Sequence, residues 1–202
     1  MLNMKRRMMQ ALMALCAVMM VSSCGGRNTS GQKDGGQKDA GTKTEDSTAA
    51  VTDTVALKKA NWAKMTEGYQ VPDFSLIDID GKEVTLADFS GKYALLDFWG
   101  TWCRYCVMGI PEMKDYYQKY SDKIEFVGID CRETQEAWKA GVEKYGLEWT
   151  NLYNGYDQSL IVEYGIQGYP SKIIISPDGK VVEAFLGEDP ALYEKLDEMF
   201  GE

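Results

Sequence analysis

Two cysteines separated by two residues are the groups in this chain best placed to do chemistry. Cys103 and Cys106 follow the apolar run 93–99 and open a stretch with helical spacing from residue 103 to about 120. This order places both sulfurs in the first turn of a helix, where unpaired N–H groups and the helix dipole favour a thiolate. We therefore expect Cys103, nearer to the helix start, to be an exposed nucleophile and Cys106 to be the resolving thiol.

Other uses of a cysteine pair remain open at this point. A structural disulfide would suit an exported protein, whereas half of a zinc site would need a second Cys or His pair that the sequence lacks. The chain contains no histidine, which excludes catalytic triads and His-ligated metal sites. We expect no metal, and no cofactor other than a redox-active disulfide between Cys103 and Cys106.

Three further residue types near the pair attract attention. Asp97 is a lone carboxylate in an apolar run; burial would be costly and should raise its pKa, unless it lies at a strand edge and touches solvent. Trp99 and Trp102 are expected to shape an apolar docking surface, with core packing as the alternative for Trp99. Cys131 is expected to pack as a small apolar residue, the alternative being a third redox thiol.

From residue 71 onward, strand-like and helix-like runs alternate, which predicts an α/β domain around a mixed sheet. The predicted strands cover residues 74–79, 82–85, 93–99, 123–130, 171–176 and 180–185. The predicted helices cover residues 103–120, 134–145, 159–164 and 190–200. Pro111 should kink the first of these helices, and Asp189 is a candidate N-cap for the last.

Several short motifs occur along the chain in an order that indicates a family resemblance. They are Val71-Pro72-Asp73-Phe74, the run from Leu96 to Cys103 with the second cysteine at 106, and Gly168-Tyr169-Pro170 before a strand. Over residues 68–202 the chain resembles the thioredoxin superfamily, specifically the extracytoplasmic, membrane-tethered TlpA and ResA branch. The resemblance implies a central mixed sheet of four or five strands flanked by helices, with an N-terminal β-hairpin and an insert at residues 131–166, after the second core strand.

The same resemblance implies roles for individual residues. Pro170 should be cis and lie against the cysteine pair, so that Tyr169, Pro170 and Trp102 bind an extended substrate. Asp97 matches the buried acid that serves as general base for the resolving thiol, here Cys106. Two positions depart from the pattern: Tyr105 stands where relatives often carry Pro or His, and Gly109 where some carry Glu, so that any role of that carboxylate is expected to be lost.

The N-terminal part of the chain predicts export and anchoring. Residues 5–7 are basic and residues 8–21 are apolar but too short to span a bilayer, so residues 1–23 are predicted to be a signal peptide. The segment 21–25 resembles a bacterial lipobox, in which Cys24 would be lipidated; the alternative is an ordinary signal peptide with an incidental cysteine. Residues 24–67 are predicted to be a flexible tether, with 57–70 ambiguous between short helix and linker.

These observations predict a thiol-disulfide oxidoreductase, anchored by lipid at the periplasmic face of a bacterial membrane. Its partners would be the dithiols and disulfides of exported proteins and a membrane thiol donor. The net charge of −9 argues against nucleic acid. Two alternatives remain: a peroxiredoxin-like thiol peroxidase, although residues 96–102 lack the expected proline, and a non-catalytic binding module or copper chaperone. The direction of electron flow stays open, because residues 104 and 105 fit no known pattern.

Overall fold

The structure is a computed structural model that describes residues 46–201, with side chains from residue 51 onward. The predicted signal peptide, Cys24 and the first half of the predicted tether lie outside the described residues.

All strands of the described residues belong to one mixed sheet, with the order β2-β1-β5-β4-β3-β6-β7. The strands are β1 (Ser75–Asp78), β2 (Glu83–Thr85), β3 (Tyr93–Trp99), β4 (Ile124–Asp130), β5 (Thr150–Tyr153), β6 (Ser171–Ile175) and β7 (Val181–Leu186). Strand β3 is central, with β4 parallel on one side and β6 antiparallel on the other. The central position pairs both edges of β3, and helices that pack on both faces of the sheet bury its side chains on either side, which explains its nearly continuous apolar sequence.

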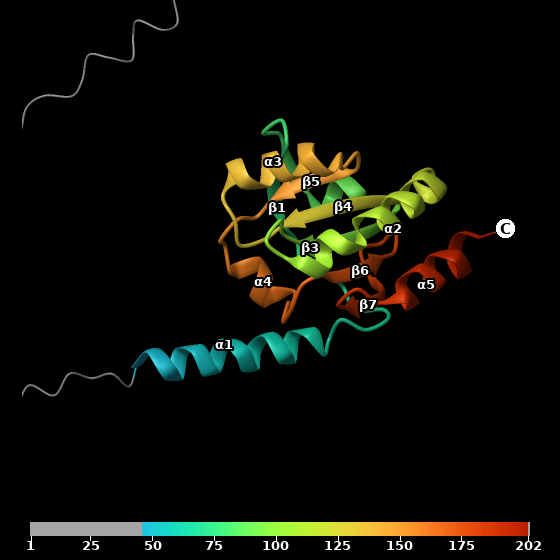
Figure 1. Cartoon of the computed structure of the whole chain (residues 1–202). Helices are drawn as coiled ribbons and strands as arrows, with labels where there is room; N and C mark the ends of the chain where they lie inside the picture. Colours follow the sequence, from blue (N-terminus) through green and yellow to red (C-terminus); the bar gives the residue numbers. More distant parts are fainter. Residues whose placement is uncertain (1–45, 202) are drawn as a thin grey trace, which may run out of the picture. The chain divides into compact units, whose positions relative to one another are not determined.

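Helices cover both faces of this sheet (Figure 1). They are α1 (Asp46–Trp62), α2 (Arg104–Tyr120), α3 (Gln135–Tyr145), α4 (Ser159–Glu163), α5 (Pro190–Phe200) and the 3-10 turn η1 (Leu86–Phe89). Apolar residues of α2, α3 and α5 pack with Leu95 and Trp99 of β3, whereas those of η1 and α4 pack with Leu96 and Phe98. Alternate residues of β3 therefore serve two separate cores, one on each side of the sheet.

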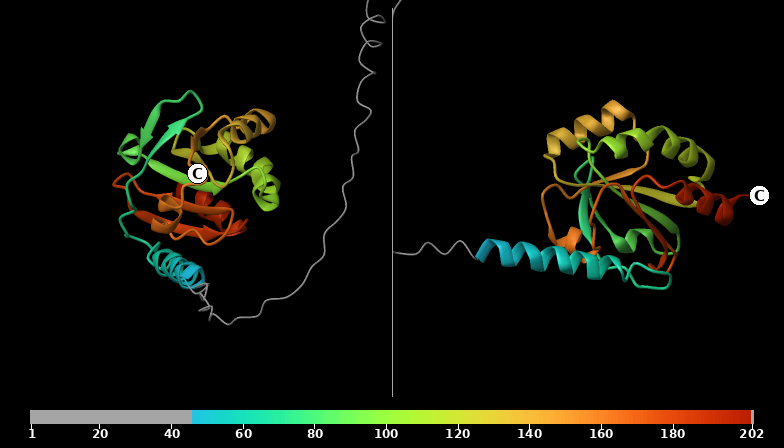
Figure 2. Two further views of the ribbon diagram at one scale, coloured as in Figure 1. Left: turned by 90° about the vertical axis from the view of Figure 1, so that its left-hand side faces the viewer. Right: turned by 60° about the horizontal axis from the view of Figure 1, so that its bottom comes forward.

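The predicted hairpin, core strands and helices are all present, and Asp189 caps α5 by accepting a hydrogen bond from the Ala191 N–H. The described residues form seven strands, one more than the six that the sequence pattern predicts. The sequence analysis missed β5, which is short, and β1 pairs with it. Because of that pairing, the N-terminal hairpin extends the central sheet instead of lying apart from it (Figure 2).

Helix α1 occupies the second half of the segment predicted to be a flexible tether. Its last turns lie against α4, where the Asn61 side chain donates a hydrogen bond to the Val162 carbonyl at 2.8 Å. Gly165 permits this approach: it has a φ of +67°, and a Cβ there would overlap the backbone of Trp62. Long-range packing of this kind is not visible in local composition, which is why the segment reads as linker.

Candidate active site

Cys103 and Cys106 lie where the chain leaves β3 and enters α2. Cys103 is the N-cap residue of α2, and its sulfur accepts a hydrogen bond from the Cys106 N–H at 3.2 Å. The two residues form a disulfide, with their Cα atoms 5.3 Å apart. Their exposures are 5% and 6%, so the expected exposure of Cys103 is not found in the disulfide form. What distinguishes Cys103 is its position at the helix terminus.

The loop before Cys103 is fixed by the residues that follow β4. The Trp102 indole N–H donates to the Cys131 carbonyl at 2.8 Å, and the Thr101 N–H donates to Glu133 at 2.8 Å. The Thr101 hydroxyl donates a second hydrogen bond to the same carboxylate. Glu133 is buried, so these bonds supply donors that its charge requires. The sequence analysis missed Glu133, because nothing local links it to Thr101.

Asp130, at the end of β4, forms a carboxyl pair with Glu133. Burial, together with the hydrogen bond and negative charge of Glu133, raises the pKa of Asp130 to about 9. Its Oδ1 accepts no hydrogen bond from the described residues, whereas its Oδ2 accepts one from the Gly155 N–H at 3.3 Å. The rule that selected Asp97, a lone acid in an apolar strand, could have selected Asp130 as well.

Aromatic side chains surround the opening to the disulfide. The rings of Trp102 and Tyr169 meet edge to face with centroids 5.2 Å apart, and the Arg132 guanidinium lies 4.9 Å above the Trp102 ring. Trp102 is 46% exposed, and the neighbouring Tyr105 and Met108 are also exposed. Together these side chains form an exposed, largely apolar surface around the start of α2.

The Tyr169–Pro170 peptide is cis, as the resemblance implies. The turn around it is held by two hydrogen bonds at 2.8 Å, from the Ser171 hydroxyl to the Gly168 carbonyl and from the Gly187 N–H to the Pro170 carbonyl. The Tyr169 ring beside Trp102 places this turn next to the loop that carries Cys103. Trp102, Tyr169 and Pro170, the residues predicted to bind substrate, therefore lie together in the structure.

Asp97 lies on the side of β3 that faces α2, and one small cleft is lined by both Asp97 and Cys106. The side chain is 15% exposed, and its Oδ1 accepts no hydrogen bond from the described residues. Burial raises the pKa of Asp97 to about 6; Lys172 opposes the rise and Glu188 adds to it. A carboxylate so placed can accept a proton from a thiol beside it.

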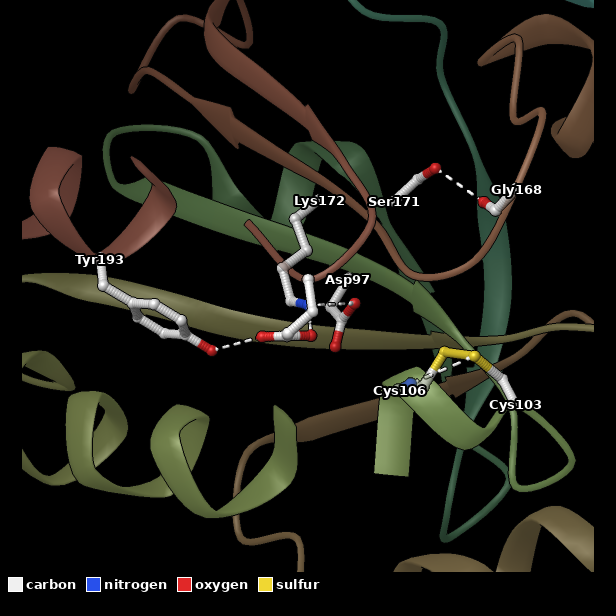
Figure 3. A network of polar contacts seen from close by, with 8 residues as sticks. Asp97, Cys103, Cys106, Gly168, Ser171, Lys172 and Tyr193 are labelled. Atoms are coloured by element: carbon white, nitrogen blue, oxygen red, sulfur yellow. Dashed lines mark hydrogen bonds and ion pairs between the residues drawn. A yellow bond between two sulfur atoms is a disulfide. The ribbon is translucent and has the colours of Figure 1, made fainter. Parts of the chain in front are cut away.

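A cation that the sequence analysis did not single out lies beside Asp97. Lys172 is directly opposite Asp97 in the β3–β6 register, with its ammonium 3.8 Å from the carboxylate and 2.8 Å from that of Glu188. Figure 3 shows Asp97 between Lys172 and the disulfide. A carboxylate nevertheless occupies the space beside the glycine at 109, because a Cβ on Gly109 would overlap the Glu188 carboxylate.

Cys131 is the free cysteine of the described residues. It is fully buried in the core on the α4 side of the sheet, whereas Cys103 and Cys106 belong to the core on the α2 side. Burial also raises the pKa of the Cys131 thiol well above its ordinary value. These facts favour the packing role expected for it.

Fold and site together define the class of protein: a thioredoxin-like thiol-disulfide oxidoreductase, whose disulfide caps a helix beside a cis-proline turn. The chain belongs to the AhpC/TSA family, whose model matches residues 68–184.

Individual relatives agree with this class. The thiol-disulfide oxidoreductase ResA of Bacillus thuringiensis (strain Al Hakam) is 39% identical over 130 residues, which cover 64% of this chain and 75% of the relative. ResA of Bacillus subtilis (strain 168) is 32% identical over 124 residues, with 61% and 69% covered.

Solved structures give the same result. The thioredoxin domain of a thiol-disulfide oxidoreductase from Bacteroides vulgatus has a TM-score of 0.61 and 30% identity, covering 66% of this chain and 96% of that one. A thiol-disulfide oxidoreductase from Bacteroides fragilis has a TM-score of 0.59 and 28% identity, covering 65% and 99%.

Two further findings concern membranes and metals. Within residues 46–201, no helix combines the length and apolar character needed to cross a bilayer. The same residues contain no cluster of three or more Cys, Asp or Glu side chains arranged to hold a metal ion.

Proposed function

We propose that this protein reduces disulfides in exported proteins, with Cys103 as nucleophile, Cys106 as resolving thiol and Asp97 as general base. The observation that carries the proposal is the Asp97 carboxylate, which has a buried oxygen that accepts no hydrogen bond from the described residues and lines one cleft with Cys106. With a pKa raised to about 6, Asp97 is mostly ionised at neutral pH but basic enough to take a proton.

The first step uses the helix terminus. In the reduced protein the Cys103 thiolate, stabilised at the N-terminus of α2, attacks one sulfur of the client disulfide. The other client sulfur leaves as a thiolate, and Cys103 is then joined to the client by a mixed disulfide. Trp102, Tyr169 and Pro170 hold the client segment beside the sulfur.

The second step uses Asp97. The Cys106 thiol gives its proton to Asp97, and its thiolate attacks the Cys103 sulfur. This closes the Cys103–Cys106 disulfide and releases the second client sulfur as a thiolate. The client gains two electrons and the protein dithiol loses two, so the redox chemistry requires no additional cofactor. A thiol donor at the membrane then restores the dithiol.

The location is part of the proposal. The basic cluster and short apolar run of residues 1–23 support export, and the lipobox-like segment supports lipidation at Cys24. A protein held in this way at the periplasmic face would meet client proteins after they cross the membrane. Residues 24–45 would separate the lipid from α1.

Trapping of clients tests the mechanism. We expect Cys106→Ser in the full chain to accumulate mixed disulfides on Cys103 when expressed in a bacterial host that exports it. The additional change Cys131→Ser should leave them unaltered, and Cys103→Ser should abolish them. Absence of any trapped exported protein, or trapping that survives Cys103→Ser, would contradict the proposal.

The direction of electron flow has its own test. A reductase should have a potential below about −200 mV, whereas strong oxidants lie near −120 mV. Equilibration of the purified chain with glutathione buffers measures this value, and a potential near −120 mV would reverse the proposed direction. Peroxide consumption that depends on Cys103 would instead favour the thiol peroxidase alternative.

A further inference from the structure

A buried ammonium group sits between two carboxylates behind the cysteine pair. The Lys172 side chain is 3% exposed, and its Nζ lies 2.8 Å from Glu188 and 3.8 Å from Asp97. A buried lysine requires charged or polar partners, and here both partners are acids. One positive charge therefore faces two carboxylates. The ammonium of Lys172 lies closer to Glu188 than to Asp97.

Glu188 is fixed from three sides. Its Oε2 accepts from Lys172 at 2.8 Å, and its Oε1 accepts from the Tyr193 hydroxyl at 2.8 Å. Its carboxylate fills the space above Gly109 on α2, where no side chain stands in the way. The preceding residue, Gly187, donates its N–H to the carbonyl of cis Pro170. Glu188 is thus held between α2, α5 and the Pro170 turn.

We propose that Lys172 and Glu188 are positioning residues that set the proton affinity of Asp97, and through it the pH at which Cys106 is deprotonated. Glu188 does this in two ways. It holds the Lys172 ammonium farther from Asp97 than from itself, and its own negative charge opposes ionisation of Asp97. Lys172 acts in the opposite direction, because a cation near a carboxylate favours the ionised form.

This inference rests on the proposed role of Asp97 as base, but it makes a separate statement about charge. Without Lys172, Asp97 would be an acid beside a second acid with no cation near it, and would lose its proton only at higher pH. Without the charge of Glu188, Lys172 would be free to pair with Asp97 alone. In the intact arrangement the two influences leave the pKa of Asp97 at about 6, between these extremes.

Other groups also face Asp97, and the test must keep them constant. Tyr193 approaches from α5, and its own pKa is raised by burial, by Glu188, by Glu112 of α2 and by Asp97. The charge of Asp97 also contributes to the raised pKa of Cys131, which directly follows β4. Cys106 lines the same cleft from α2 and is held in the disulfide during the measurement.

The experiment compares two nearly isosteric substitutions in the full chain, Glu188→Gln and Lys172→Met. The readout is the carboxyl carbon-13 chemical shift of Asp97 in the oxidised protein as a function of pH, assigned with Asp97→Asn. We expect Glu188→Gln to move the Asp97 titration to lower pH and Lys172→Met to move it to higher pH, each by on the order of one pH unit.

A matched control comes from a second acid with the same kinds of partner. Asp197 accepts hydrogen bonds from Lys119, Tyr116 and Tyr120, and lies on α5 like Tyr193. We expect Asp197→Asn to leave the Asp97 titration in place. Tyr193→Phe, which removes one donor to Glu188 but no charge at neutral pH, should move it less than Lys172→Met does.

The two shifts must have opposite signs. Movement of the Asp97 titration in the same direction in both variants, as general loosening of the cleft would cause, overturns the inference, and so does no movement in either. Neither outcome depends on turnover. If the titrations move as expected but Asp97→Asn keeps full activity, the fault lies with the proposed base and not with the charge arrangement.

Discussion

Two acids on the neighbouring strands β3 and β4 differ in the charge of the groups around them. Asp130 in β4 is fully buried and the Asp97 side chain in β3 is 15% exposed, and each has an oxygen with no hydrogen-bond donor among the described residues. The pKa of Asp97 is raised by burial to about 6 in the presence of Lys172, whereas burial and Glu133 raise that of Asp130 to about 9. Burial alone therefore does not set the state of an acid. The charge of the neighbouring group matters as well, because Lys172 lowers the pKa of Asp97 whereas Glu133 raises that of Asp130.

The largest effect should come from removing the base. Asp97→Asn should slow disulfide reduction at neutral pH by on the order of 100-fold, because Cys106 loses its proton acceptor. Asp130→Asn should change the rate less than about 3-fold, since its proton is already held at neutral pH. Stopped-flow reduction of a model disulfide by the full chain measures both rates. Equal losses in the two variants would remove the distinction drawn between the acids.

The pH dependence of the unfolding free energy should report the protonation of Asp130. An acid with a pKa of about 9 when folded and about 3.9 when unfolded binds its proton more tightly in the folded state. Its contribution is therefore complete below pH 4 and is lost as the pH rises toward 9. Between pH 6 and pH 8 this costs roughly 2.7 kcal/mol of unfolding free energy.

Asp130→Asn mimics the protonated form, so it should flatten this pH dependence. Urea unfolding at pH 6 and pH 8 measures it, with Asp97→Asn as the matched strand variant. A slope that persists undiminished in Asp130→Asn would show that its proton is not the one involved.

A hydrogen bond to Glu133, the carboxyl neighbour of Asp130, should contribute less to stability. Thr101→Val removes a hydroxyl that donates to Glu133 and should lower the unfolding free energy by about 1–2 kcal/mol. The Thr101 N–H still holds the loop, so reduction of a model disulfide should stay within about 3-fold. Urea unfolding with parallel rate measurements checks this. A severe loss of rate with unchanged stability would instead give Thr101 a direct role at the sulfurs.

The smallest effect is expected at an exposed acid. Hydrogen bonds from Lys119, Tyr120 and Tyr116 lower the pKa of Asp197 to about 2. Its contribution is therefore present above about pH 4 and lost as the pH falls toward 2. Solvent screens such a pair, so Asp197→Asn should lower the melting temperature at pH 7 by less than about 3 °C. Differential scanning calorimetry at pH 7 measures it, and a larger drop would mean that exposed acids also matter to this fold.

Features that belong to a short stretch of sequence could be predicted. Contacts that depend on how distant strands pair could not. The cysteine pair, the acid at 97 and the proline at 170 belong to short motifs, and the strands and helices follow from periodicity. Lys172 and Glu188 were not found, because only the pairing of β3 with β6 brings Lys172 opposite Asp97. A single lysine in an apolar strand was a usable signal, by the same reasoning that selected Asp97.

Contacts between distant segments explain the other differences. Strand β5 is only four residues long and joins the sheet through its neighbours β4 and β1, so periodicity could not reveal it. Helix α1 has no clear apolar face of its own, and its end is held by α4. In both cases the stabilising partner lies far away in the chain.

The burial of Lys172 also affects its reactivity toward reagents in solution. Reagents that label lysine react with the neutral, accessible amine. The Lys172 ammonium is almost fully covered and lies near two acids. Exposed lysines such as Lys92 and Lys180 can be labelled in the folded protein, whereas Lys172 must wait until the cleft opens. The labelling rate of this one side chain would therefore measure how often the region behind the disulfide opens.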